Sequence, residues 1–222
     1  MDMTALGVSL RLAVSTIVVL LPLGIWLGRI LATHEFRGKL LVETLVTVPL
    51  VLPPSVLGFY LLTAFGGRSW LGGVFERLIG HTLTFSFEGL LLASLIVNVP
   101  FVVQPIQRGF EAIPENIIAA ASCCGLSPVQ RFLRIELPLA WASILTASIL
   151  TFAHTLGEFG VVLMVGGNLP GQTRTLSIAI YDRMQAFDDR SAGVMAATLL
   201  VVALVTLMTT TALSRRVGVR RV

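Results

Sequence analysis

Long apolar runs divide the chain into stretches that are each about long enough to cross a bilayer. These runs cover about residues 12–28, 44–65, 89–107, 139–166 and 191–213. A transmembrane helix needs about 20 mostly apolar residues. The pattern therefore predicts an all-α integral membrane protein with about five transmembrane helices, or six if the longest run is interrupted.

Two of these runs carry signals that interrupt a straight helix. The 44–65 run has Pro49, Pro53 and Pro54 near its middle. Adjacent prolines remove two backbone donors and disfavour helix at the residue before them. The 139–166 run would be about 42 Å long as one helix, more than a single crossing requires. It either leaves the bilayer or breaks near Gly157 and Gly160.

The longest stretch that is neither a span nor a tail is the 111–138 segment. Its local signals describe two short helices. Gly125 can end the first in a left-handed conformation, and Ser127 is a good N-cap for the second. Pro138 is expected to restart the next element. A compact helical hairpin between two spans predicts a docking element at the membrane face.

The polar connections add little regular structure. We expect a short helix at about residues 176–186, and the apolar piece within residues 66–88 is too short for a span. The N-terminus carries Asp2, has no basic region and is not followed by a small-x-small cleavage site. It does not resemble a cleaved signal peptide, so we expect it to be retained.

Composition narrows the class of protein. The chain is 55% hydrophobic and only 13% charged, with a mean hydropathy of +0.88. Soluble domains carry about a quarter charged residues, so we expect residues 1–222 to form a single transmembrane domain. The net charge of +4 does not indicate nucleic-acid binding, because the basic residues lie between apolar runs. The adjacent Cys123 and Cys124 offer neither a disulfide framework nor metal-ligand spacing.

The basic residues also predict an orientation. Ten of them lie in residues 29–43, the 111–138 segment with the preceding Arg108, and the C-terminal tail, and six lie in the other connections and near the N-terminus. Because Lys and Arg are enriched on the cytoplasmic side, we expect the 111–138 segment and the C-terminus to be cytoplasmic. With five spans, the N-terminus is then outside.

The 111–138 segment resembles the cytoplasmic signature of ABC importer permease subunits, E-A-A-x3-G-x9-I-x-L-P. The matching residues are Ala120, Ala121, Gly125, Ile135, Leu137 and Pro138. Ala119 stands where the family has Glu, so any role of that carboxylate does not transfer. In that family the segment is the coupling helix, which docks on the ATPase subunit. The resemblance thus implies ATPase coupling through these residues and Leu126 and Phe132, together with a type I ABC importer permease fold.

Three further motifs are similar to those of the molybdate branch. They are PLVLPPSVLG at residues 49–58, LGEFG at residues 156–160 and GNLPGQTRTL at residues 167–176. The LGEFG motif is shared with sulfate permeases, which keeps sulfate or thiosulfate as an alternative cargo. The resemblance implies a molybdate (or tungstate) permease of a bacterial inner membrane. It also implies a second copy of the chain, two ATPase subunits that bind ATP and Mg, and an external molybdate-binding protein.

Ionisable residues inside the predicted spans are candidates for the translocation pathway. His154 and Glu158 are one helical turn apart and share a face. Such residues usually face a bundle interior or a cavity, so the pair either lines a gate or fixes helix packing. A carboxylate is a poor ligand for a dianion. Glu158 is therefore better suited to holding a neighbouring helix or a backbone donor than to binding substrate.

Other residues have comparable alternatives. Asn98, Gln104 and Gln107 either line the pathway or join helices by hydrogen bonds. Pro53 and Pro54 either break the helix, so that backbone donors of neighbouring residues are exposed to a passing anion, or only kink it. The basic residues in the predicted outer connections either attract an anion or are ordinary solvated charges; they are Arg68, Arg174 and Arg183.

The chain is not expected to be an enzyme. It has no G-x4-G-K-[ST] phosphate loop, no nucleophile–base arrangement and no metal-type cluster. A self-sufficient secondary transporter is the other function class. Against it, five spans give no inverted repeat of equal halves, and Glu158 alone is a poor basis for proton coupling.

Overall fold

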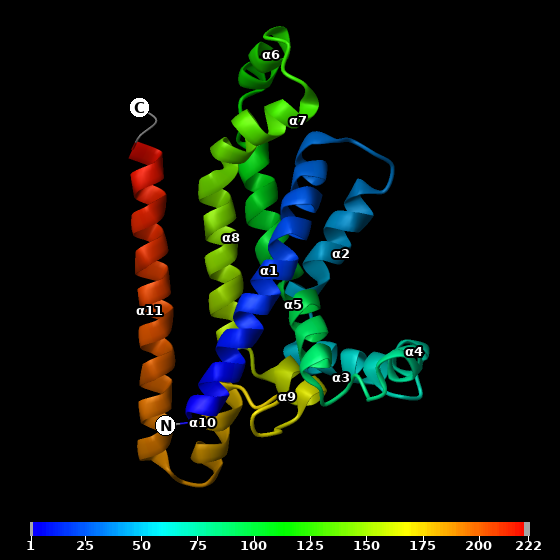
Figure 1. Ribbon diagram of the computed structural model, residues 1–222, viewed down its shortest axis with the longest axis vertical. Coiled ribbons are helices and arrows are strands. Elements are labelled where there is room, and N and C mark those ends of the chain that lie inside the picture. Colours follow the sequence, from blue (N-terminus) through cyan, green and yellow to red (C-terminus); the bar gives the residue numbers. More distant parts are fainter. Residues whose placement is uncertain (1, 220–222) are drawn as a thin grey trace.

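The computed structural model describes residues 2–219, and its regular elements in this range are helices (Figure 1). In chain order they are α1 (Met3–Thr33), α2 (Lys39–Val51), α3 (Pro54–Phe65), α4 (Trp70–Ile79), α5 (Phe87–Glu111), α6 (Glu115–Cys123), α7 (Pro128–Arg131), the π-helix η1 (Phe132–Glu136), α8 (Leu137–Gly157), α9 (Gly160–Gly166), α10 (Leu176–Gln185) and α11 (Asp189–Val219). The expectation of an all-α protein is confirmed for the described residues.

Helices α1, α5 and α8 form the centre of the molecule. Their shared core contains Leu20, Ile106 and Ile144, all of which are buried. Small residues allow close approach: a Cβ on Gly24 would lie 2.1 Å from Cγ1 of Val102 in α5. Lipid offers no hydrophobic drive between helices, so such close packing is a main source of association in a membrane.

Among the residues that the structure describes, four helices are long and apolar enough to cross a membrane, and the pair α2 and α3 makes a fifth candidate if it counts as one span. The predicted number of about five is confirmed. The first span is longer than predicted at both ends, since α1 covers Met3–Thr33 rather than residues 12–28. The extra turns are held by neighbours, because the Ser9 hydroxyl accepts the backbone N–H of Leu176, which begins α10.

The predicted second span is broken, not merely kinked. Helix α2 ends at Val51, α3 begins at Pro54, and the two are bent by 111°. Pro53 and Pro54 lack the backbone N–H groups that would continue the α2 ladder, which explains the position of the break. Helix α3 consequently runs across the lower part of the bundle in Figure 1.

The predicted fourth span also breaks. Of the two alternatives that its length left open, the structure shows the interruption near Gly157 and Gly160. Helix α8 ends at Gly157 and α9 begins at Gly160. Helix α9 has seven residues, about 10 Å, and is too short to add a sixth crossing. It packs on α3, where a Cβ on Gly58 would lie 2.9 Å from Sδ of Met164.

The 111–138 segment and the N-terminal end of α1 lie at opposite ends of the molecule. Figure 1 shows α6 and α7 at the top, with α10 and the N-terminus at the bottom. Helix α11 stands beside α8 and ends near the level of α7, and its outward face is apolar and exposed at residues such as Leu200 and Leu204. Of the basic tail used to predict orientation, Arg220 and Arg221 lie outside the described residues.

Candidate functional site

The turn after α6 is a hydrogen-bonded helix end built around Gly125. Gly125 has φ +75°, and its N–H donates to the carbonyl of Ser122 while the N–H of Leu126 donates to that of Ala121. These two bonds make a Schellman motif, which satisfies carbonyls that a helix end otherwise leaves open. The predicted left-handed end of the first helix is therefore present at Gly125.

The next helix begins with a capping box. The N–H of Gln130 donates to Oγ of Ser127 at 3.3 Å, and the N–H of Ser127 donates to Oε1 of Gln130 at 3.0 Å. Pro128 occupies the first helical position, where its missing N–H costs nothing. The N-cap predicted at Ser127 is present.

Pro138 lies in the first turn of α8, as predicted for the start of the next element, but no break in the helix precedes it. Helices α7, η1 and α8 follow one another without a break, so a continuous helical stretch runs from Pro128 to Gly157. The N–H of Leu137 donates five residues back, to the carbonyl of Phe132. This wider π-turn directly precedes Pro138 and accommodates its ring, which in a regular helix would crowd the carbonyl four residues earlier.

The predicted coupling residues differ in exposure. Ala119, Ala120 and Gly125 are exposed, Ala121 is buried, and Leu126, Phe132, Ile135, Leu137 and Pro138 are half-buried. Residues on one side of α6 therefore pack inward, while Ala119 and Ala120 remain at the surface. An exposed helical surface at this end of the bundle is available to a partner.

A buried carboxylate at the base of this segment was missed by the sequence interpretation. Glu136 is 2% exposed, and its Oε1 accepts a hydrogen bond from Nε of Arg131 at 2.8 Å. Its Oε2 accepts one from Nε of Arg29, near the end of α1, at 2.5 Å. The Arg29 guanidinium also lies over the Phe132 ring, 4.9 Å from its centroid. No sequence signal joins Glu136 to Arg29, because 107 residues separate them.

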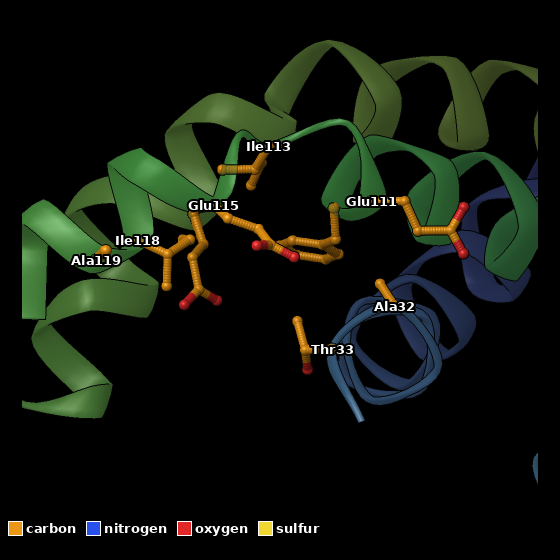
Figure 2. A pocket seen from close by; sticks show the side chains of 9 residues that line it. Ala32, Thr33, Glu111, Ile113, Glu115, Ile118 and Ala119 are labelled. Atoms are coloured by element: carbon orange, nitrogen blue, oxygen red, sulfur yellow. The ribbon is translucent and has the colours of Figure 1, made fainter. Parts of the chain in front are cut away.

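A pocket of about 490 Å³ lies beside this carboxylate, between α6 and the end of α1. Figure 2 shows Ile118 and Ala119 on α6 at one side and Ala32 and Thr33 on α1 at the other. Glu136 also lines the pocket. The small side chain of Ala119 therefore borders open space.

Within the bundle, three of the predicted pathway residues come together. Nδ1 of His154 lies 3.1 Å from Oδ1 of Asn98, and Nε2 of His154 lies 3.7 Å from Oε2 of Glu158. The ring of Phe101 stacks on the imidazole at a centroid distance of 4.1 Å. The shared face predicted for His154 and Glu158 is thus present, with Asn98 completing the cluster from α5.

Hydrogen bonds extend this cluster in both directions. Nδ2 of Asn98 donates to the carbonyl of Ser94, whose hydroxyl bonds to that of Thr16 on α1 at 2.8 Å. At the other end, Oε1 of Glu158 accepts the N–H of Val161 at 3.0 Å. Glu158 therefore caps α9 by satisfying one of its open backbone donors, as an N-cap side chain does.

Pro53 and Pro54 lie at the α2–α3 break, where both are exposed. The break of the fourth span lies against them, because a Cβ on Gly160 would be 2.9 Å from Cβ of Pro54 and 3.8 Å from Oε1 of Glu158. The two interrupted spans, separated by about a hundred residues in the chain, thus meet at one place. This arrangement brings the predicted proline and carboxylate positions into one region.

Other polar residues named from the sequence lie elsewhere. Gln104 and Gln107 face α2, where their Nε2 atoms donate to Oγ1 of Thr47 and Oε1 of Glu43. They line a polar pocket of about 390 Å³ between α2 and α5. Arg174 is held by Asn168, Asp182 and Asp2, so it is not a simple solvated charge. Within residues 2–219, no three His, Cys, Asp or Glu side chains are grouped to hold a metal ion.

Comparison with known proteins gives the family. Residues 20–219 match the family described as binding-protein-dependent transport system inner membrane component. A molybdenum transport system permease protein of Azotobacter vinelandii is 45% identical over 187 residues, which cover 84% of this chain and 83% of that protein. A probable sulfate transport system permease protein of Chlorella vulgaris is 34% identical over 179 residues, covering 81% of this chain and 67% of that protein.

A solved structure shares the fold at low sequence identity. It is the bacterial alginate ABC transporter in complex with an alginate pentasaccharide-bound periplasmic protein, with a TM-score of 0.77 and 17% identity over 97% of this chain and 78% of that one. The molecule accordingly has the type I ABC importer permease fold. Because the family match covers residues 20–219 and the relatives are aligned over most of their length, the chain belongs to the inner membrane components of binding-protein-dependent transport systems.

Proposed function

We propose that this chain is the membrane-spanning subunit of an ATP-driven importer of molybdate. The observation that carries the proposal is the 45% identity to a molybdenum transport system permease over 84% of the chain. Sulfate is the second candidate, supported by a lower identity of 34% to a sulfate permease. Molybdate and tungstate are tetrahedral dianions of similar size, and the choice between them belongs to an external binding protein.

In this proposal, residues 1–222 form a single transmembrane domain that works as a pair of identical chains. Two ATPase subunits dock on the two 111–138 segments, and they bind the ATP and Mg. An external molybdate-binding protein delivers the anion to the opposite face. The 111–138 segment and the C-terminus are then cytoplasmic and the N-terminus is outside, in agreement with the distribution of basic residues.

ATPase docking is assigned to the exposed part of the 111–138 segment. Ala119, Ala120 and Gly125 offer accessible surface at the end of the bundle, and the capped turn fixes the relative position of α6 and α7. ATP binding would draw the ATPase subunits together and move these segments. The membrane domain would thereby shift between two arrangements that ligands on either face stabilise differently.

The pathway is assigned to the region where the two broken spans meet. Pro53 and Pro54 interrupt one span beside the α8–α9 break, and such backbone at membrane depth requires a protein or water-filled surrounding. Asn98, His154 and Glu158 lie together near this break. In this role Glu158 holds the start of α9 and does not bind the anion, because like charges repel.

The chain itself is not assigned a catalytic role or a cofactor. A phosphate loop is absent from the sequence, so ATP hydrolysis belongs to the partner subunit. A self-sufficient secondary transporter is disfavoured by the family match, which is to binding-protein-dependent systems.

Reconstitution tests the proposal. The chain is placed in sealed vesicles with its ATPase subunit and binding protein, and uptake of molybdate is measured with and without ATP, in competition with sulfate. We expect uptake that requires ATP and all three components, with molybdate preferred. Molybdate uptake by the chain alone without ATP would overturn the importer assignment. A preference for sulfate would transfer the cargo assignment to the second candidate.

The docking assignment has a separate test at Gly125. Replacing Gly125 with Val forces a β-branched residue into φ +75°, although an added Cβ meets nothing within 4 Å. The cost of about 1–2 kcal/mol is therefore local backbone strain and not a clash. We expect weaker co-purification of the ATPase subunit. The matched control is Gly7→Val, which also meets nothing within 4 Å but lies at the opposite end of the molecule. Equal co-purification by both variants would argue against the assignment.

A further inference from the structure

The environment of Glu136 goes beyond what a folding contact requires. Its side chain is 3% exposed, whereas those of Arg29 and Arg131 are 24% and 26% exposed. A carboxylate this deeply buried needs paired charges that stay with it, because losing one partner leaves an uncompensated charge. Moving either arginine away from Glu136 therefore costs free energy, which favours joint displacement of the three side chains.

These contacts connect three separate parts of the molecule. Arg29 belongs to α1, and Arg131 ends α7. Nη1 of Arg131 also donates to Oγ of Ser122 on α6 at 3.3 Å. A single carboxylate thus joins the N-terminal helix to both short helices of the 111–138 segment.

Direct packing offers little alternative connection between α6 and α1. The pocket of about 490 Å³ separates them, with Ile118 and Ala119 facing Ala32 and Thr33 across it (Figure 2). Close packing transmits displacement because it cannot be compressed, and an open pocket lacks this property. The charged contacts beside the pocket therefore link α6 and α7 directly to α1, in addition to the indirect route through the continuous helix from Pro128 to Gly157, whose α8 part packs on α1.

We propose that Glu136 is a positioning residue that ties α1 to the 111–138 segment, so that displacement of α6 and α7 by the ATPase subunit reaches α1 through the Arg131–Glu136–Arg29 contacts. This inference rests on the proposed function. The planar guanidinium groups suit the task, because each presents donors in a fixed fork and has little freedom to slide along the carboxylate. The Phe132 ring under Arg29 adds a second restraint on α1.

The test follows one distance inside the assembled transporter. Spin labels are placed on the native Cys123, at the end of α6, and on His34→Cys, just after α1, with Cys124→Ser removing the neighbouring thiol. Positions 34 and 123 are both exposed. Labelled chain is diluted into unlabelled chain, so that each distance is measured within one chain. In the otherwise unchanged chain we expect the same label distance before and after ATP is added.

Removing the charge should uncouple this link. In Glu136→Gln we expect the label distance to change when ATP is added, and molybdate transported per ATP hydrolysed to fall about tenfold, a typical size for coupling between sites. ATPase binding should persist, since the exposed docking surface is unaltered. The matched control is Glu76→Gln, which removes an exposed carboxylate from α4, outside the 111–138 segment and the assigned pathway, and should leave both readouts unchanged.

A second variant keeps the test decisive if Glu136→Gln fails to fold. Arg29→Lys keeps the charge but loses the fork, and we expect it to lower transport per ATP in the same direction. An unchanged label distance and transport ratio in the variants that assemble would overturn the inference. Failure of the proposed function is recognised separately, as absent molybdate uptake by the unaltered chain. The label distance on ATP addition decides the inference in a transporter whose unaltered chain takes up molybdate.

Discussion

Two carboxylates flank α8, and their surroundings differ. Glu136 precedes the helix and shares its oxygens between two arginines from α1 and α7. Glu158 follows the helix and gives one oxygen to the backbone N–H of Val161, while His154 lies 3.7 Å from the other. One end of α8 is therefore held by paired charges, and the other by hydrogen bonds.

The difference indicates separate mechanical tasks. Charge pairing fixes helices whose ends lie near water, where arginines can remain partly exposed. A hydrogen-bonded carboxylate can hold a short helix such as α9 without a full counter-charge nearby, and it keeps a neighbouring region polar. The predictions that follow test whether these two ends depend on charge to different degrees.

The largest effect is expected for Glu136→Ala. The substitution leaves Arg29 and Arg131 without their shared partner in a mostly buried site, and breaking such a pair costs about 3 kcal/mol. Thermal unfolding in detergent should show a clearly lower midpoint than for the unaltered chain. Glu115→Ala, at an exposed carboxylate of the same pocket, is the control. Equal midpoints for the two variants would mean that the charge pairing does not hold this end.

A moderate effect is expected where the broken spans meet. A Cβ introduced by Gly160→Ala would lie 2.9 Å from Cβ of Pro54, whose ring cannot rotate away. Overpacking of this kind costs about 2 kcal/mol. Gly157→Ala is the control, since a Cβ there meets nothing within 4 Å. Unfolding measurements that find the two variants equally stable would contradict the close approach of the two breaks.

The smallest effects are expected at Glu158. Glu158→Ala removes the cap of α9 and should cost about 1 kcal/mol, whereas Glu158→Gln retains an oxygen that accepts the N–H of Val161 and should cost less than about half of that. Comparison of the two free energies of unfolding separates hydrogen bonding from charge. If Gln is as costly as Ala, the attraction to His154 is the main contribution, and the contrast with Glu136 disappears.

Much of this architecture was predictable because the relevant signals are local. The apolar runs gave the number of spans, and Gly125, Ser127 and Pro128 gave the turn and cap of the 111–138 segment. Pro53 and Pro54 indicated where the second span is interrupted, and α2 ends just before them. Each of these residues acts through its own backbone or through neighbours within a few positions, so its effect can be read without knowing the fold.

The remaining features depend on contacts between distant segments. The prolines do not specify the 111° angle between α2 and α3, nor the packing of α3 on α9 that accompanies it. The Glu136–Arg29 pair joins residues 107 positions apart. The unbroken helix before Pro138 was not predicted, because the π-turn that accommodates the proline has no recognised sequence signal. The cap of α9 by Glu158 required knowing first that the fourth span ends at Gly157.

Because of the π-turn, the number of residues between Gly125 and Pro138 determines how α7 is rotated relative to α8. Each residue of an α-helix turns the chain by about 100° around its axis. Deleting one residue from η1 (Phe132–Glu136) would therefore shorten the protein only slightly, but it would swing α7 around α8 and point Arg131 away from Glu136. The number of residues in this segment therefore sets the angle around the α8 axis at which the docking surface faces its partner.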